Sequence, residues 1–140
     1  MPATVALGRR RRTDTAARRA AEYSSRLCRR LDVKRGDVVT VAVQGDYGKP
    51  RPAVVVQSDL FNETHPSITV LPLTSTIVDA PLLRLTIDPG RENGLGRVSQ
   101  VMVDKALTLP REKVGKTIGR LDEDVMIRVT RALAMWLGIA

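Results

Sequence analysis

Short apolar runs separated by turn-forming residues dominate the chain after residue 37. The runs are rich in Val, Ile, Leu and Thr, and clusters of Gly, Pro, Asn and Asp lie between them. This pattern predicts six β-strands, at Val38–Val43, Ala53–Gln57, Ile68–Leu73, Leu82–Ile87, Ser99–Val103 and Ala106–Leu109. Several runs are continuously apolar, which indicates strands buried on both faces and favours a tightly curled small barrel.

Two glycine-containing polar segments predict the longer connections between these strands. Gln44–Pro50 holds two glycines and is expected to be a mobile connection between the first two strands. Asp88–Arg97 predicts a second, longer turn region before the fifth strand.

A helical period replaces the strand pattern near the C-terminus. Apolar residues there recur every three or four positions: Leu121, Val125, Val129, Ala132, Leu133 and Trp136. The spacing predicts a helix from about Glu123 to Leu137, with Asp122 as its N-cap and acidic residues at the positive end of its dipole. We expect the apolar face to pack against the strands, and stacking of Trp136 on RNA is the alternative.

Charge separates the chain into a basic leader and a balanced body. Residues 1–35 hold eleven Lys and Arg against three acidic residues, whereas the rest of the chain holds twelve of each sign. The formal net charge of +8 therefore lies in the leader. The body is long enough for one hydrophobic core and too short for two. We expect a basic extension at residues 1–32 and one domain at residues 33–140.

The basic leader itself divides in two. Residues 1–14 contain the run Arg9–Arg12, whose self-repulsion favours disorder. Over Thr15–Leu31 the apolar residues are spaced by three or four, which predicts an amphipathic helix. RNA, an acidic partner or a membrane surface are candidate ligands of this helix, and a solvated extension without a specific role is the alternative.

Composition excludes several kinds of protein and site. The chain has one cysteine, Cys28, and one histidine, His65, so it forms no intramolecular disulfide and no Cys/His zinc site. No run has the length of a membrane span, and no apolar segment follows the first arginines as in a signal peptide. We expect a cytoplasmic protein, although residues 1–31 share the Arg-rich, acid-poor composition of an organelle transit peptide.

The sequence also excludes several familiar catalytic arrangements. His65 lies in the loop sequence NETHPS and is expected to be a solvated loop residue. No Ser/His/Asp or Cys/His constellation can be assembled, and no cluster of carboxylates predicts a two-metal site. Gly115-Lys116-Thr117 resembles the end of a phosphate-binding loop, but Pro110 stands where that loop requires glycine.

Polar positions at two strand ends remain as candidates for chemistry. Arg51 stands between two prolines, which restrict the backbone and present its side chain at a strand entrance. Its guanidinium is a planar fork that matches the oxygens of a phosphate. Thr74 and Ser75 put hydroxyl donors at the end of the third predicted strand. An ordinary exposed arginine and an ordinary strand-end threonine are the alternative interpretation.

Three motifs in this order resemble the MazF/PemK family of toxin endoribonucleases. They are KRGDVVTV, KPRPAVVVQSDLFN and TVLPLTS, at residues 34–41, 49–62 and 69–75. In that family RGD opens the first strand, RP opens the second, and Thr or Ser closes the third. The resemblance runs from Val33 to the C-terminus and includes Asp104-Lys105 and the sequence IGRLDEDVM before the final helix.

The resemblance implies a mainly β fold, a small SH3-like β-barrel with a C-terminal α-helix, and an enzyme. Such enzymes cut single-stranded RNA at short sequences without a metal or other cofactor, and leave a 2′,3′-cyclic phosphate and a 5′-hydroxyl. Arg51 and Thr74 take the catalytic positions, with Ser75 supporting them, and Lys49 and Lys105 are expected near the RNA. Since arginine stays protonated at neutral pH, we expect Arg51 to clamp the phosphate and donate a proton, and the base is unassigned.

The resemblance also implies partners. Family members are homodimers whose RNA groove spans both subunits, and an antitoxin lays an acidic tail across that groove. Two alternatives are a non-catalytic toxin of the same fold that inhibits DNA gyrase by protein contact, and an inert RNA-binding module whose basic leader supplies affinity. The leader is foreign to the family, so translation that naturally starts near Val33 is a further hypothesis.

Overall fold

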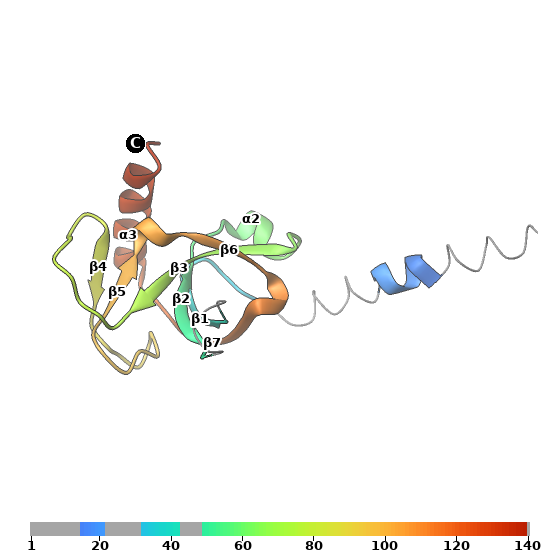
Figure 1. The fold of residues 1–140 in the computed structure, drawn as a ribbon, viewed down its shortest axis with the longest axis horizontal. Helices are drawn as coiled ribbons and strands as arrows, with labels where there is room; N and C mark the ends of the chain where they lie inside the picture. The colour runs from blue at the N-terminus through green and yellow to red at the C-terminus, as the bar shows by residue number, and fades with distance from the viewer. Residues whose placement is uncertain (1–14, 22–31, 43–48, 140) are drawn as a thin grey trace, which may run out of the picture. The chain divides into compact units, whose positions relative to one another are not determined.

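The protein is represented by a computed structural model that describes residues 15–21, 32–42 and 49–139 (Figure 1). Most of the predicted Gln44–Pro50 connection, the predicted disorder of residues 1–14 and most of the predicted leader helix, residues 22–31, lie outside these residues. The chain divides into two compact units, residues 1–32 and 33–140. In the first unit, residues 15–21 form a helix with exposed side chains, among them Arg18 and Arg19.

The second unit is an antiparallel sheet with a C-terminal helix. Its strands are β1 (Asp37–Val41), β2 (Arg51–Val55), β3 (Ser67–Thr74), β4 (Arg84–Ile87), β5 (Ser99–Met102), β6 (Leu107–Pro110) and β7 (Val114–Arg120). Hydrogen-bonded neighbours follow the order β4-β5-β3-β2-β1-β7, and β6 also pairs with β3. The six predicted strands are therefore all present, although β2 starts and ends two residues earlier than expected, β1 ends two residues earlier and β4 starts two residues later.

The central strands carry the core, as their continuous apolar runs predicted. Side chains on both faces of β1, β2 and β3 are buried, for example Val38, Val39 and Val54, each fully inaccessible to solvent. Alternation would be expected only where one face meets water. One face is buried because Val38 and Val54 pack in one core cluster with Val129 and Ala132 of the C-terminal helix. The sheet curls around the other face (Figure 1).

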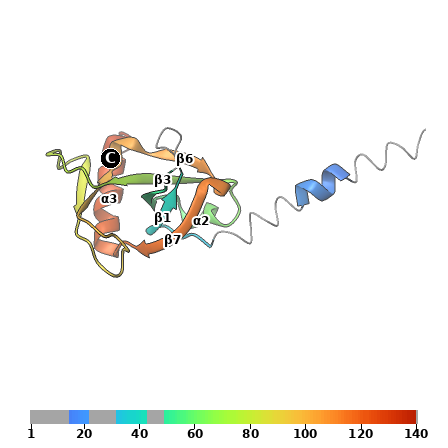
Figure 2. The same cartoon turned by 60° about the horizontal axis from the view of Figure 1, so that its bottom comes forward.

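The sheet is bent but is not shown to be closed. The chain passes from β6 through the single turn η2 (Arg111–Lys113) into β7, on the side of the unit away from α3 (Figure 2). Within the described residues, β6 pairs with β3 and β7 pairs with β1. No pairing joins β6 to β7 there, so the sheet is open between these two strands. The structure thus has the mainly β architecture that was predicted, while the closed SH3-like barrel stays a prediction.

The C-terminal helix α3 (Glu123–Trp136) confirms the predicted helix and its cap. The Asp122 side chain accepts the N–H of Val125 at 2.8 Å. Val129 and Ala132 are buried in the core. The expectation that Trp136 packs there is wrong, because it is 49% exposed. The last turn of α3 runs past the sheet (Figure 1), so Met135 is also exposed.

A short helix and a strand, besides two 3-10 turns, were not predicted from the sequence. The single turn α2 (Asp59–Asn62) follows β2, and β7 includes Gly115-Lys116-Thr117, the segment that resembles the end of a phosphate-binding loop. β7 has little strand signal because most of its residues are exposed and it contains two glycines. Gly119 is needed there, since an added Cβ would lie 2.6 Å from the carbonyl oxygen of Glu92.

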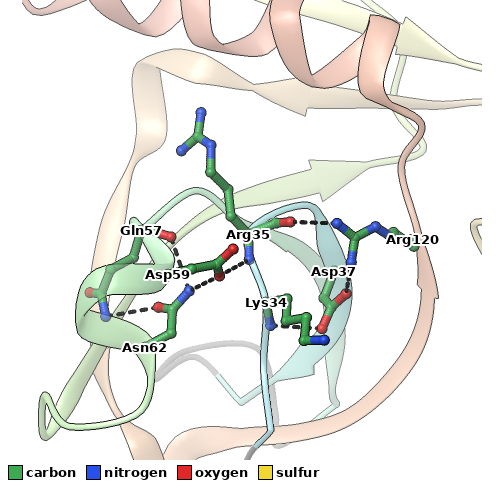
Figure 3. A network of polar contacts seen from close by, with 7 residues as sticks. All are labelled: Lys34, Arg35, Asp37, Gln57, Asp59, Asn62 and Arg120. Atoms are coloured by element: carbon green, nitrogen blue, oxygen red, sulfur yellow. Dashed lines mark hydrogen bonds and ion pairs between the residues drawn. The ribbon is translucent and has the colours of Figure 1, made fainter.

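The KRGD motif forms the turn that leads into β1, and it bonds to β2 and to the residues before α3 (Figure 3). Gly36 has φ +94°, a left-handed conformation that favours glycine. Its N–H donates to Val55 at 2.8 Å and its carbonyl accepts from Leu121 at 2.9 Å. The turn thereby fixes β1 against β2 and against the residues that lead into α3.

Charged and amide side chains complete this turn. The Asp37 carboxylate accepts the N–H of Lys34 at 2.9 Å and forms an ion pair with Arg120 at 3.4 Å (Figure 3). The Arg35 N–H donates to Asp59 at 2.8 Å, and this bond is the largest cause of a lowered pKa of the Asp59 carboxyl group. The Arg35 side chain points toward α3 and donates to Thr130. The RGD sequence therefore supports the fold.

Candidate functional site

The candidate site lies along one transverse row of residues on neighbouring strands, near the ends of β1, β2 and β3. Val41 of β1 pairs with Arg51, the first residue of β2. Ala53 of β2 pairs with Pro72 of β3. Arg51 lies two residues before Ala53, and Thr74 lies two residues after Pro72. Arg51 and Thr74 therefore lie two residues beyond the last β2–β3 pair, on neighbouring strands whose paired parts are about 5 Å apart.

Arg51 marks the point where this row leaves the core. Its neighbour Val41 is almost completely buried, whereas Arg51 is exposed. Residues that face each other across an antiparallel pair project from the same face of the sheet. The guanidinium therefore leaves the sheet beside buried apolar side chains, as expected from its position between two prolines.

Thr74 is the last residue of β3 and pairs with Gln100 of β5. Its side chain is half-buried, and its Oγ1 accepts the N–H of Thr76 at 3.2 Å. The hydroxyl can accept this bond and still donate its own hydrogen to a phosphate oxygen. Ser75 follows directly and is exposed.

The predicted lysines occupy different positions relative to this row. Lys49 is exposed and precedes Arg51 by two residues. Lys105 is the last residue of η1 (Val103–Lys105). This turn lies between Val101, which pairs with Leu73, and Leu107, which pairs with Val70. Lys105 is thus set back from the end of β3 toward its middle, and its predicted contact with RNA stays a prediction.

One cation and one amide near the row were missed in the sequence. Lys113 is exposed, and its carbonyl accepts the N–H of Ala42, the residue after β1. Gln100 is buried beside Thr74. Neither has a local signal, because their positions depend on pairings between strands far apart in the sequence.

His65 confirms the expectation of an exposed loop residue. It precedes β3 by two residues, and its ring Nδ1 lies 3.1 Å from the N–H of Ser67. Thr74 lies at the opposite end of β3, roughly 23 Å away for seven residues of strand. Within one chain His65 therefore has no access to the candidate site. Among the described residues no group of three or more His, Cys, Asp or Glu side chains is arranged to hold a metal.

A cavity found elsewhere belongs to the KRGD turn and not to this row. Its volume is about 760 Å³, and it lies at the opposite end of β1 from Val41. The lining includes Arg35, Asp59, Glu92, Arg120, Asp122 and Glu123. Both arginines already bond to neighbouring groups of the protein.

Within the described part of the chain, no helix is long and apolar enough to span a membrane.

Comparisons with a family model and with known proteins indicate one and the same protein family. Residues 34–137 match the model of the "PemK-like, MazF-like toxin of type II toxin-antitoxin system". The chain is 48% identical over 109 residues to a Mycolicibacterium smegmatis protein named "Probable endoribonuclease MazF", covering 77% of this chain and 99% of that one. It is 29% identical over 111 residues to "Endoribonuclease EndoA" of Bacillus subtilis, covering 76% and 96%.

A solved structure shows that the fold is shared as well. It is an endoribonuclease in complex with its cognate antitoxin from a mycobacterial species, with a TM-score of 0.64 and 23% identity, covering 77% of this chain and 97% of that one. The folded body and the motifs that build its transverse row lie within the matched region. The chain therefore belongs to the PemK-like, MazF-like toxins of type II toxin–antitoxin systems.

Proposed function

We propose that this MazF-type endoribonuclease toxin cuts single-stranded mRNA at short sequences, without a metal ion, in the cytoplasm. Arg51 and Thr74 hold the scissile phosphate, and Ser75 supports them. The products are a 2′,3′-cyclic phosphate and a 5′-hydroxyl. The register that leads from the Ala53–Pro72 pair to Arg51 and Thr74 is the observation that carries this proposal.

The chemistry requires charge stabilisation and two proton transfers. The 2′-oxygen attacks phosphorus as its proton leaves to a base, and the bond from phosphorus to the 5′-oxygen breaks as that oxygen gains a proton. Arg51 can donate two parallel hydrogen bonds to the phosphate oxygens and stabilise the charge that develops on them. The Thr74 hydroxyl adds a third donor. The base stays unassigned, since His65 lies at the other end of β3.

Nearby cations fit an RNA backbone that crosses the strand ends. Lys49, Arg51 and Lys113 are exposed around the end of β1, on segments joined by the pairings of β1. Phosphate contacts of this kind supply affinity without reading sequence. We place the RNA along this end of the sheet, with Lys105 as a more distant contact.

The proposal also covers the partners and the fold in finer detail. The toxin is a homodimer, and an antitoxin with an acidic tail competes for the cationic strand ends, as attraction between complementary charges would favour. Complex formation in a solved mycobacterial relative supports the antitoxin.

For the domain itself we propose a closed SH3-like barrel, with η2 helping to close it. Similarity to named endoribonucleases favours an enzyme over a gyrase-binding toxin or an inert RNA-binding module.

Cleavage of a long single-stranded RNA in EDTA tests the reaction. We expect cleavage to persist in the chelator, at a limited set of sites. The new 5′ ends should accept phosphate from a polynucleotide kinase without prior phosphatase treatment, because they carry a hydroxyl. Arg51→Ala protein purified in the same way controls for contaminating ribonuclease.

Other results would contradict the proposal. Loss of cleavage in EDTA with recovery in magnesium would show a metal-dependent reaction. Products with 5′-phosphate ends would show that water or another external nucleophile attacks instead of the 2′-oxygen. An RNA that stays intact while the protein inhibits gyrase would support the non-catalytic alternative.

A further inference from the structure

Gln100 is a buried amide whose hydrogen bonds connect β5 to the segment that follows Thr74. It is 3% exposed. Its Nε2 donates to the carbonyl of Val78 at 3.0 Å and to Thr86 Oγ1 at 3.2 Å, and its Oε1 accepts the N–H of Val78 at 3.1 Å. One side chain thus bonds to both backbone groups of Val78, and the Val78 carbonyl also accepts the N–H of Ala80 at 3.2 Å.

The same segment bonds to the Thr74 hydroxyl. Thr76, two residues before Val78, donates its N–H to Thr74 Oγ1. Gln100 also pairs with Thr74 across β3 and β5. The path of the chain from Thr74 to Val78 is therefore fixed at both ends, at Thr74 by the strand and at Val78 by Gln100. Between these ends lies the N–H that orients the hydroxyl.

We infer that Gln100 is a positioning residue for cleavage, acting through Val78 and Thr76 on the direction in which the Thr74 hydroxyl donates. With Thr76 occupying one acceptor position of Oγ1, the hydroxyl hydrogen is directed away from the segment 75–78. Releasing Val78 removes that constraint, and the hydroxyl then also donates to water or backbone carbonyls. This inference rests on the proposed role of Thr74.

A second glutamine separates this role from ordinary support of the fold. Gln57 Oε1 accepts the N–H of Thr69 at 3.2 Å, and its Nε2 donates to the carbonyl of Ser67 at 3.1 Å. Gln57 thus holds backbone at the first residues of β3, as Gln100 holds backbone beyond its last residue. Loss of either amide removes the acceptor of one backbone N–H, that of Val78 or that of Thr69, but only Gln100 lies on the side of Thr74.

The test compares Gln100→Leu with Gln57→Leu in the full-length protein. We expect both substitutions to lower the midpoint of urea unfolding. At a temperature where both variants are folded, Gln100→Leu should lower kcat for RNA cleavage on the order of 10- to 100-fold, because small misplacements of catalytic groups have effects of that size. KM should change less than kcat. Hydrogen exchange should accelerate at Thr76 and Val78, and Gln57→Leu should leave kcat near wild type.

Gln100→Glu provides a conservative variant. Its carboxylate can accept from Val78 but cannot donate to the Val78 carbonyl, whereas the protonated acid regains one donor. Relative to wild type at the same pH, the cleavage rate of Gln100→Glu should therefore rise as pH is lowered. A ratio that does not change with pH would argue against the hydrogen bond to Val78 as the cause.

Failure of this inference can be told from failure of the proposed site. If Arg51→Ala and Thr74→Ala abolish cleavage while Gln100→Leu has the kcat of wild type, the inference is wrong and the site stands. If Gln57→Leu and Gln100→Leu lower kcat equally, both act through stability alone, which also overturns the inference. If Arg51→Ala and Thr74→Ala cleave normally, the proposed site itself is wrong.

Discussion

Arg51 lies where the buried core meets the surface on which we propose that RNA is cut. It is the first residue of β2 and is exposed, while Val41 beside it is buried. The two flanking prolines cannot donate backbone hydrogen bonds, so the chain enters the sheet at this residue and not before it. The charge is thereby held at the sheet boundary, where a guanidinium retains solvent access and a neighbouring strand end supplies Thr74.

At this position, Arg51→Ala should nearly abolish cleavage while leaving the fold intact. The side chain is exposed, so its removal costs little packing, but the loss of one transition-state donor typically lowers the rate about 10²- to 10³-fold. Arg51→Lys should recover part of the activity because it keeps the charge and loses the fork. Thr74→Ala should impair cleavage less than Arg51→Ala. Initial rates on one RNA, with circular dichroism for folding, measure both effects.

Arg91→Ala is the matched control, since it removes an exposed arginine from the turn region before β5. Its cleavage rate should equal that of wild type. Wild-type rates for both Arg51→Ala and Thr74→Ala would show that the site lies elsewhere. An equal loss in Arg91→Ala would point instead to the overall charge of the protein.

Site residues with a local sequence signal could be predicted, whereas residues brought to the site by strand pairing could not. Proline neighbours and the end of an apolar run mark Arg51 and Thr74, and the family resemblance gave them a role. Gln100 and Lys113 come near the same row only through the pairing of β5 with β3 and of β7 with β1. Such pairings join residues more than twenty positions apart, and local patterns carry no information about them.

At the scale of elements, β7 forms a strand although its sequence has little strand signal. It was missed because it lacks an apolar run, yet it pairs with β1 over most of its length, with two shifts in register. Its glycines permit this. A Cβ on Gly119 would meet the backbone of Glu92 and Asn93, so the strand and the turn region approach each other too closely for any side chain.

Gly119→Ala should therefore destabilise the folded body. The added methyl group collides with backbone, which cannot rotate away as a side chain can, and overpacking of this kind typically costs about 1–3 kcal/mol. Gly96→Ala is the control, because an added Cβ there meets nothing within 4 Å. It should change stability by less than about 0.5 kcal/mol. Urea unfolding followed by fluorescence of Trp136 gives both values, and equal stability of the two variants would contradict the close approach.

At the scale of the whole molecule, charge and fold are distributed unequally between the two units. Residues 1–32 hold nine arginines against three acidic residues, whereas residues 33–140 hold fourteen basic and twelve acidic side chains. The strands, the transverse row and α3 all belong to the second unit. The first unit can thus add electrostatic attraction to RNA without contributing a residue to the proposed chemistry.

A truncated protein that starts at Val33 should fold, dimerise and cut the same RNA sites as the full chain. Val33 is 4% exposed in the second unit and is retained. RNA affinity should fall and depend less on salt, because each lost phosphate contact reduces the slope of log K against log salt by about 0.7 for single strands. A full-length variant with Arg9–Arg12 replaced by serine should show an intermediate slope. A monomeric or insoluble truncated protein would show that residues 15–31 are part of the fold, and a changed cleavage sequence would show that the leader takes part in recognition.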